Sequence, residues 1–196
     1  YDYTKLRIMP KSQLYDGPGE VQWTDIWDIS YPNTTSNCFG IRPARMKDST
    51  DTFYLTVHSP FVTKRDFGIY KLSNPLTDPE LNGKRVTVTQ YSSPTDPEQL
   101  GGGDPKIDGG GTNIRNEPVF INGKLYLVHS VKNDTESAAR LVVINDDYSV
   151  DSDIQIGESS YFHTYPAVAV NKHGDVLIPY SRSSAETYMG ANFTLI

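Results

Sequence analysis

Three residues whose side chains could take part in chemistry each stand directly before a proline: Arg42, Glu117 and Tyr165. An arginine can hold a substrate carboxylate, a glutamate can act as a general base and a tyrosine can act as a nucleophile. The same three could instead be polar residues that line a channel and solvate one another. Most glycoside hydrolases use two carboxyl groups, so a lone Glu117 favours ligand binding over catalysis.

Other polar residues give weaker indications of a site. His58 and His129 each precede a serine at matching places and could bind a metal, although histidines at strand ends more often simply pack. Two acidic stretches, Asp104 to Asp108 and Asp146 to Asp153, offer oxygen ligands suited to calcium, but neither has the spacing of a known calcium loop. Turn formation is the commoner role of such aspartates. We therefore expect no metal and no cofactor, with calcium as the open alternative.

An internal repeat indicates which elements position these residues. Three segments share one pattern: 41–72, 116–144 and 165–196. Each begins with a strand that opens near a proline and continues through a hairpin into an apolar strand that ends near a serine. A polar loop and another apolar strand complete the unit. Asn122-Gly123 predicts a two-residue hairpin turn, because both positions favour positive φ. The alternating stretch 85–91 predicts an outer strand for the first unit.

The repeat predicts an all-β chain that forms a partial β-propeller of about three four-stranded antiparallel blades. Residues 1–40 are then an N-terminal segment that could be part of an earlier blade, and 41–100 form blade unit one with its outer strand. A Gly/Asp-rich linker covers 101–114, blade unit two covers 115–160, and a truncated blade unit three covers 161–196. A propeller usually has at least four blades, so closure requires more chain or another copy.

The composition of the chain limits the kinds of partner that it can bind. The net charge is −6 and no basic stripe is present, which argues against nucleic acid. No run of 18 apolar residues occurs, so we expect no membrane span. A single cysteine, Cys38, rules out an internal disulfide. Three glycosylation sequons, at Asn33, Asn133 and Asn192, favour a secreted glycoprotein.

Four motifs carry a resemblance to a known family: residues 71–77 (KLSNPLT), 99–108 (QLGGGDPKID), 122–126 (NGKLY) and 165–176 (YPAVAVNKHGDV). With them the chain resembles secreted bacterial β-propeller repeat proteins that are distantly similar to the sialidase-like, BNR-type group. The resemblance implies a propeller outside the cell and assigns no reaction. The chain departs from true sialidases, because the Ser-x-Asp-x-Gly-x-x-Trp box is absent and Arg42 directly abuts its proline.

These observations together predict a non-catalytic extracellular β-propeller module that recognises a glycan or a protein, or that assembles with copies of itself. The alternative is a sialidase-like or five-bladed glycoside hydrolase. In that alternative the catalytic residues are Arg42, Glu117 and Tyr165, whose side chains must then face a common axis.

Overall fold

The computed structural model describes residues 3–15 and 19–196, and the remaining parts of segment 1–40 lie outside the described residues. The chain is all-β, as the sequence predicts, with several antiparallel sheets. The only helical element in the described ranges is a single 3-10 turn, η1 (Lys11–Leu14). A short hairpin of β1 (Leu6–Ile8) and β2 (Thr24–Ile26) precedes the larger sheets.

The first sheet has four antiparallel strands in the order β3-β5-β6-β7. They are β3 (Arg42–Pro43), β5 (Phe53–His58), β6 (Lys64–Ser73) and β7 (Glu80–Tyr91). The short strand β3 lies at one edge and the long strand β7 at the other. The predicted outer strand at 85–91 is therefore the second half of β7.

The middle sheet repeats this order with one added strand. Its antiparallel strands are β8 (Val119–Ile121), β9 (Lys124–Asn133), β10 (Glu136–Asn145) and β11 (Val150–Ile156). The added strand, β4 (Arg45–Met46), runs parallel to β8. Because β4 follows β3 after one residue, the first and middle sheets are joined at their short strands.

The third sheet contains β12 (Phe162–Thr164), β13 (Ala169–Val170), β14 (Val176–Ser184) and β15 (Thr187–Leu195). Strands β12 and β13 pair with opposite ends of β14, so together they act as one interrupted inner strand. Strand β15 pairs with the other side of β14.

The predicted hairpin turn is present between β8 and β9. Asn122 and Gly123 both have positive φ, 53° and 71°. The carboxylate of Asp48 accepts hydrogen bonds from both of their backbone N–H groups, at 2.9 and 3.1 Å. The turn is therefore fixed both by its own residue types and by a loop of the preceding sheet.

The sheets stack face to face, because strand residues alternate between two apolar cores. In β9, Leu125 and Leu127 point to the core shared with the first sheet, whereas Tyr126 and Val128 point to the core shared with the third sheet. A third core lies between the first sheet and the N-terminal segment around Tyr31. The middle sheet is consequently covered on both faces.

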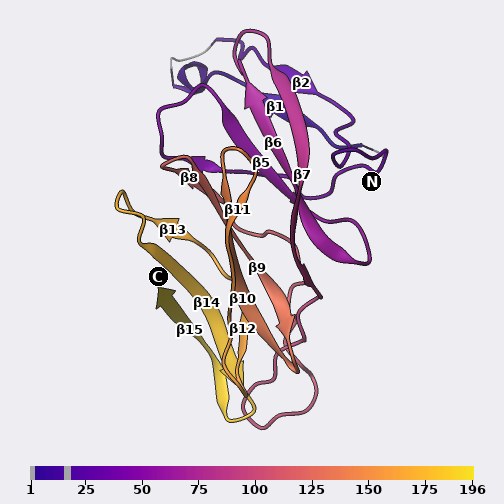
Figure 1. Ribbon diagram of the computed structural model, residues 1–196, viewed down its shortest axis with the longest axis vertical. Coiled ribbons are helices and arrows are strands. Elements are labelled where there is room, and N and C mark those ends of the chain that lie inside the picture. The colour runs from indigo at the N-terminus through magenta and orange to yellow at the C-terminus, as the bar shows by residue number, and fades with distance from the viewer. Residues whose placement is uncertain (1–2, 16–18) are drawn as a thin grey trace.

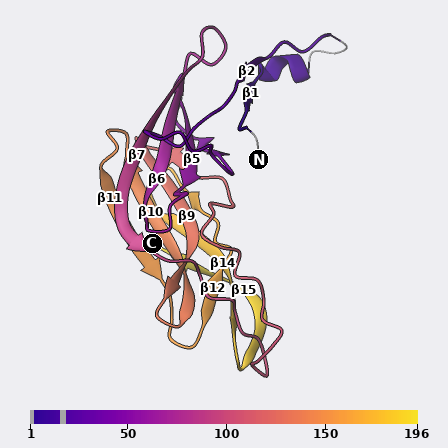
Figure 2. The same cartoon turned by 90° about the vertical axis from the view of Figure 1, so that its right-hand side faces the viewer.

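The whole molecule is elongated, with β1 and β2 near one end and the β14–β15 hairpin toward the other (Figure 1). Figure 2 shows the edge strands β7 and β11 along one side of the stack, and β14 and β15 on the opposite side. The short strands β3, β4 and β13 lie at the edges of their sheets, and residues of β3, β4, β8 and the β12–β13 link, far apart in sequence, line one common hollow.

A buried ion pair fastens the first sheet to the middle sheet. Arg140 on β10 is only 1% exposed and donates two hydrogen bonds, at 2.7 and 2.6 Å, to the carboxylate of Asp153 on β11. Arg140 also donates to the Thr89 carbonyl on β7 at 2.8 Å, and the Thr89 N–H donates to Asp153 at 2.9 Å. Burial opposes the ionisation of Asp153, but Arg140 and Thr89 outweigh burial and hold its pKa below the usual value.

Candidate functional site

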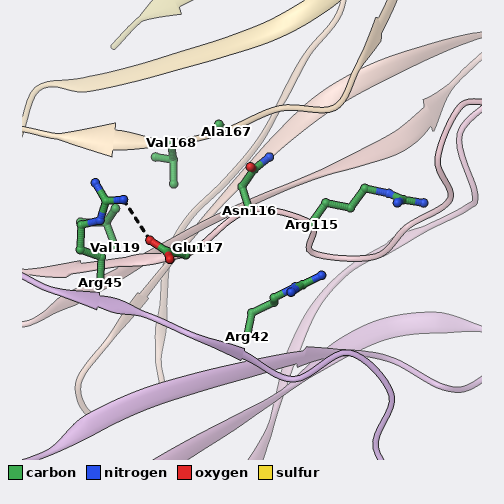
Figure 3. A pocket seen from close by; sticks show the side chains of 8 residues that line it. All are labelled: Arg42, Arg45, Arg115, Asn116, Glu117, Val119, Ala167 and Val168. Atoms are coloured by element: carbon green, nitrogen blue, oxygen red, sulfur yellow. Dashed lines mark hydrogen bonds and ion pairs between the residues drawn. The ribbon is translucent and has the colours of Figure 1, made fainter. Parts of the chain in front are cut away.

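A polar hollow of about 420 Å³ lies where the short strands of the three sheets meet. The first sheet contributes Arg42, and β4 contributes Arg45. The segment entering β8 and the link between β12 and β13 contribute the rest. Its full lining is Arg42, Arg45, Arg115, Asn116, Glu117, Val119, Ala167 and Val168 (Figure 3).

A change of strand partner at Ala44 places the first two arginines. The Ala44 N–H donates to the Tyr54 carbonyl at 2.8 Å, and the next N–H, of Arg45, donates to the Pro118 carbonyl at 2.7 Å. The chain therefore leaves the first sheet and joins the middle sheet between Arg42 and Arg45. Both guanidinium groups line the hollow from this one short segment.

Arg45 and Glu117 form the ion pair at one side of the hollow, with 2.9 Å between Nη2 and Oε2 (Figure 3). Both side chains are more than 60% exposed, so water screens the pair and its contribution to stability is small. The pair joins β4 to the residue before Pro118. Among the described residues, the Glu117 carboxylate is the only one in the lining of the hollow.

Backbone carbonyls orient the other polar groups. Arg115 donates from Nε and Nη2 to the Gly110 carbonyl at 2.9 and 2.5 Å, and Arg42 donates from Nε to the Ile114 carbonyl at 3.2 Å. The Asn116 amide donates to the Pro166 carbonyl at 2.8 Å. Each cation is thus tethered through part of its guanidinium and keeps further N–H donors for a ligand.

The structure brings Arg42 and Glu117 together in this hollow, but Tyr165 is not in its lining. The Tyr165 hydroxyl instead donates to the Asp108 carbonyl at 2.8 Å. Its ring packs on Gly110 and lies 5.5 Å from the Arg115 guanidinium carbon. Tyr165 therefore supports the loop that holds Arg115, and a mouth shared by all three residues stays a prediction.

Sequence reasoning missed Arg45, Arg115 and Asn116. It considered only the residue directly before each proline, whereas Asn116 and Arg115 stand one and two places further back, in the run Arg115-Asn116-Glu117-Pro118. That concentration of polar groups before a buried strand could have indicated a binding site. Arg45 had no comparable signal, because its place depends on the parallel pairing of β4 with β8.

The charges around the hollow favour the binding of an anionic ligand. Three guanidinium groups and one carboxylate line it, in a chain whose net charge is −6. Guanidinium groups bind carboxylates in a planar two-point geometry. One wall, formed by Val119, Ala167 and Val168, is apolar and can contact the hydrocarbon face of a ligand.

The two histidines at matching repeat positions differ in environment. His129 is 1% exposed and lies against the stacked rings of Phe67 and Tyr91 in T-shaped contacts, at centroid distances of 5.2 and 4.8 Å. Burial and the nearby Arg140 charge lower the pKa of His129 to about 3. Burial also lowers the pKa of His58.

Nowhere in the described part of the chain do His, Cys, Asp or Glu side chains gather in a group of three that could hold a metal.

Several carboxylates of the second acidic stretch, considered as calcium ligands, bind cations of the chain itself. Asp146 pairs with Lys71 at 2.7 Å, Asp151 with Lys124 at 2.9 Å and Asp153 with Arg140. The Asp147 carboxylate accepts from the Ser149 N–H at 2.9 Å, as in an aspartate turn. In the first stretch, the Asp108 carboxylate accepts from the Gly110 N–H at 2.8 Å.

The three sequon asparagines differ in accessibility. Asn33 is exposed in a turn with φ 61°, and Asn192 is exposed on β15. Asn133 is half-buried at the end of β9, where its side chain packs on Gly157. Glycosylation stays a prediction for all three, and the exposed positions Asn33 and Asn192 suit it best.

No known family model, curated protein or solved structure matches this chain. In residues 3–15 and 19–196, no helical segment has the length and apolarity needed to cross a bilayer. The function must therefore be inferred from the geometry and chemistry of the site itself.

Proposed function

We propose that the chain is a partial β-propeller whose arginine-lined hollow binds an acidic glycan. The three stacked sheets correspond to the three predicted blades, each with a short inner strand followed by long antiparallel strands. The parallel pairing of β4 with β8 supports this arrangement, because inner strands of neighbouring blades run in the same direction around a propeller axis. The hollow then lies at one mouth of that axis.

One observation carries the ligand assignment: Arg42, Arg45 and Arg115 line the same hollow as a single carboxylate, Glu117, beside an apolar wall. The arginines supply donors for a ligand carboxylate. Glu117 can accept hydrogen bonds from hydroxyl groups, and it repels a ligand that carries only negative charge. A uronate-type sugar meets all three requirements, because it combines a carboxylate, hydroxyl donors and an apolar ring face.

Binding without catalysis is the favoured form of this function. The two-carboxylate route to glycoside hydrolysis requires a second acid about 5 to 10 Å from the first. Glu117 is the only acid in the lining, over the residues that the structure describes. The alternative tyrosine nucleophile would be Tyr165, whose hydroxyl is engaged with the Asp108 carbonyl. The extracellular location rests on the family resemblance and the sequons.

A titration tests this proposal with the intact chain. Trigalacturonate is titrated into the protein in a calorimeter, and the same sugar as its methyl ester serves as the control, because the ester keeps the shape and removes the charge. We expect saturable binding of the acid that weakens with added salt, and at least tenfold weaker binding of the ester. Equal affinity for acid and ester, or no binding of either, would overturn the proposal.

A further inference from the structure

Arg115 is anchored on a run of three glycines, Gly109 to Gly111. Its Nε and Nη2 groups donate to the Gly110 carbonyl at 2.9 and 2.5 Å. This contact uses one edge of the guanidinium and leaves the edge formed by Nη1 and Nη2, which can hold both oxygens of a carboxylate. Because glycines restrict the backbone least, the direction of that free edge depends on what holds the Gly110 carbonyl in place.

Two aspartate carboxylates bind the first two amides of this run. Asp96 Oδ1 accepts from the Gly109 N–H at 2.9 Å, and Asp108 Oδ1 accepts from the Gly110 N–H at 2.8 Å. Gly110 has a φ of 80°, a left-handed conformation that glycine adopts without strain. Both aspartates belong to the same loop, so these two bonds shape the run locally and do not tie it to a sheet.

Tyr165 ties the glycine run to the third sheet. It lies in the link between β12 and β13, and its hydroxyl donates to the Asp108 carbonyl at 2.8 Å. A Cβ atom at position 110 would lie 2.8 Å from Cε1 of the Tyr165 ring, closer than van der Waals contact allows. The ring therefore packs directly on the Gly110 backbone, beside the carbonyl that holds Arg115.

The backbone of Tyr165 is held in a conformation that only a few non-glycine residues adopt. Its φ is 52°, in the left-handed region. The Tyr165 N–H donates at 3.2 Å to the hydroxyl of Ser130, a buried residue of β9. Strained residues of this kind persist where the surrounding structure holds them, and they cluster at functional sites. Here the strained residue places its side chain on the loop that holds Arg115.

We propose that Tyr165 is a positioning residue that sets the direction of Arg115 and thereby the affinity of the hollow for carboxylates. This role rests on the proposed function of the hollow. Figure 3 shows the Arg42 and Arg115 side chains extending in the same direction from different elements. A shift of the Gly110 carbonyl moves one guanidinium relative to the other, and two-point binding of a carboxylate is sensitive to such a shift. Tyr165 acts through Arg115 and needs no contact with the ligand.

A double-mutant cycle, measured by calorimetry with trigalacturonate, tests this role. Tyr165→Phe removes the bond to the Asp108 carbonyl and should weaken binding about threefold, whereas Tyr165→Ala also removes the ring and should weaken binding about tenfold. In an Arg115→Gln background, each substitution should change the affinity less than about twofold, because its effect passes through Arg115.

Tyr180→Phe is the matched control. It removes a hydroxyl that pairs with Thr194 at 3.2 Å in the same sheet, away from the glycine run, and it should bind like the wild type. Circular dichroism and melting curves establish that every variant is folded. Equal losses of affinity from Tyr165→Ala with and without Arg115→Gln would overturn the proposal, because Tyr165 would then act independently of Arg115.

A measurement without ligand separates this role from the glycan proposal. Hydrogen exchange at the Arg115 Nε–H, followed by nuclear magnetic resonance, should be slow in the wild type and at least about tenfold faster in Tyr165→Ala, because the Gly110 carbonyl is no longer held. An unchanged exchange rate overturns the role of Tyr165. If the wild type does not bind trigalacturonate, the proposed function fails, and the exchange rate alone decides whether Tyr165 positions Arg115.

Discussion

The Arg45 guanidinium and the Glu117 carboxylate lie 2.9 Å apart, although 72 residues separate them in the sequence. Their contact exists because β4 leaves the first sheet and runs parallel to β8. The pair leaves a net excess of positive charge in the hollow, since Arg42 and Arg115 line it as well.

The two arginines without a carboxylate partner should dominate ligand affinity. Arg42→Gln and Arg115→Gln are each expected to weaken trigalacturonate binding about tenfold or more, because a charge-assisted hydrogen bond is worth about 1.5 to 3 kcal/mol. Arg65→Gln, a substitution on β6 away from the lining of the hollow, is the matched control and should bind like the wild type. Equal losses in all three variants, measured by calorimetry, would indicate a general charge effect and not a site.

The buried ion pair should be a major source of stability. Asp153→Asn leaves the buried Arg140 guanidinium without its counter-charge, and we expect the free energy of unfolding to fall by about 3 to 5 kcal/mol. Asp151→Asn, two residues away on the same strand, breaks an ion pair with Lys124 that is partly open to solvent and should change stability little. Urea unfolding curves of both variants measure the contrast. Similar losses from the two substitutions would contradict this account.

His129 should make stability depend on pH. Its pKa is about 3 when folded and about 6.5 when unfolded, so between these values the unfolded chain binds a proton that the folded chain does not. Stability is therefore complete above about pH 6.5 and falls by about 1.4 kcal/mol per pH unit as the pH drops toward 3.

His129→Phe removes this titration and keeps a ring against Phe67 and Tyr91. Chemical denaturation from pH 7 to pH 4 should therefore show a shallower loss of stability for this variant. The remaining slope comes from other groups, including His58 and His163, whose pKa values burial also lowers. His173→Gln, in an exposed turn, should follow the wild type. Parallel curves for His129→Phe and the wild type would show that His129 does not titrate on unfolding.

The sheets could be predicted from the sequence because their signals are local. Alternation in β9 separates Leu125 and Leu127 from Tyr126 and Val128, and each pair enters a different core. The Asn122-Gly123 turn follows from residue types that tolerate positive φ. These signals need no knowledge of distant parts of the chain.

The site was harder to predict, because long-range register decides it. The position of Arg45 depends on β4 pairing with β8, and the direction of Tyr165 depends on the loop at Gly110, which no repeat pattern specifies. Arg140 appears as a polar residue in an apolar strand, and only the stacking of β7 on β11 makes it a buried partner of Asp153. Such contacts are properties of the assembled sheets.

The most direct test of anion recognition is the replacement Glu117→Gln, measured by titration with trigalacturonate and by an assay for released sugar. The glutamine keeps an oxygen that can accept from ligand hydroxyl groups and removes a charge that repels the ligand carboxylate, so affinity should rise about threefold, since an exposed charge pair is worth up to about 1 kcal/mol. Neither protein should then release sugar. A wild type that hydrolyses the substrate, together with a folded Glu117→Gln that does not, would contradict this account and assign Glu117 a catalytic role.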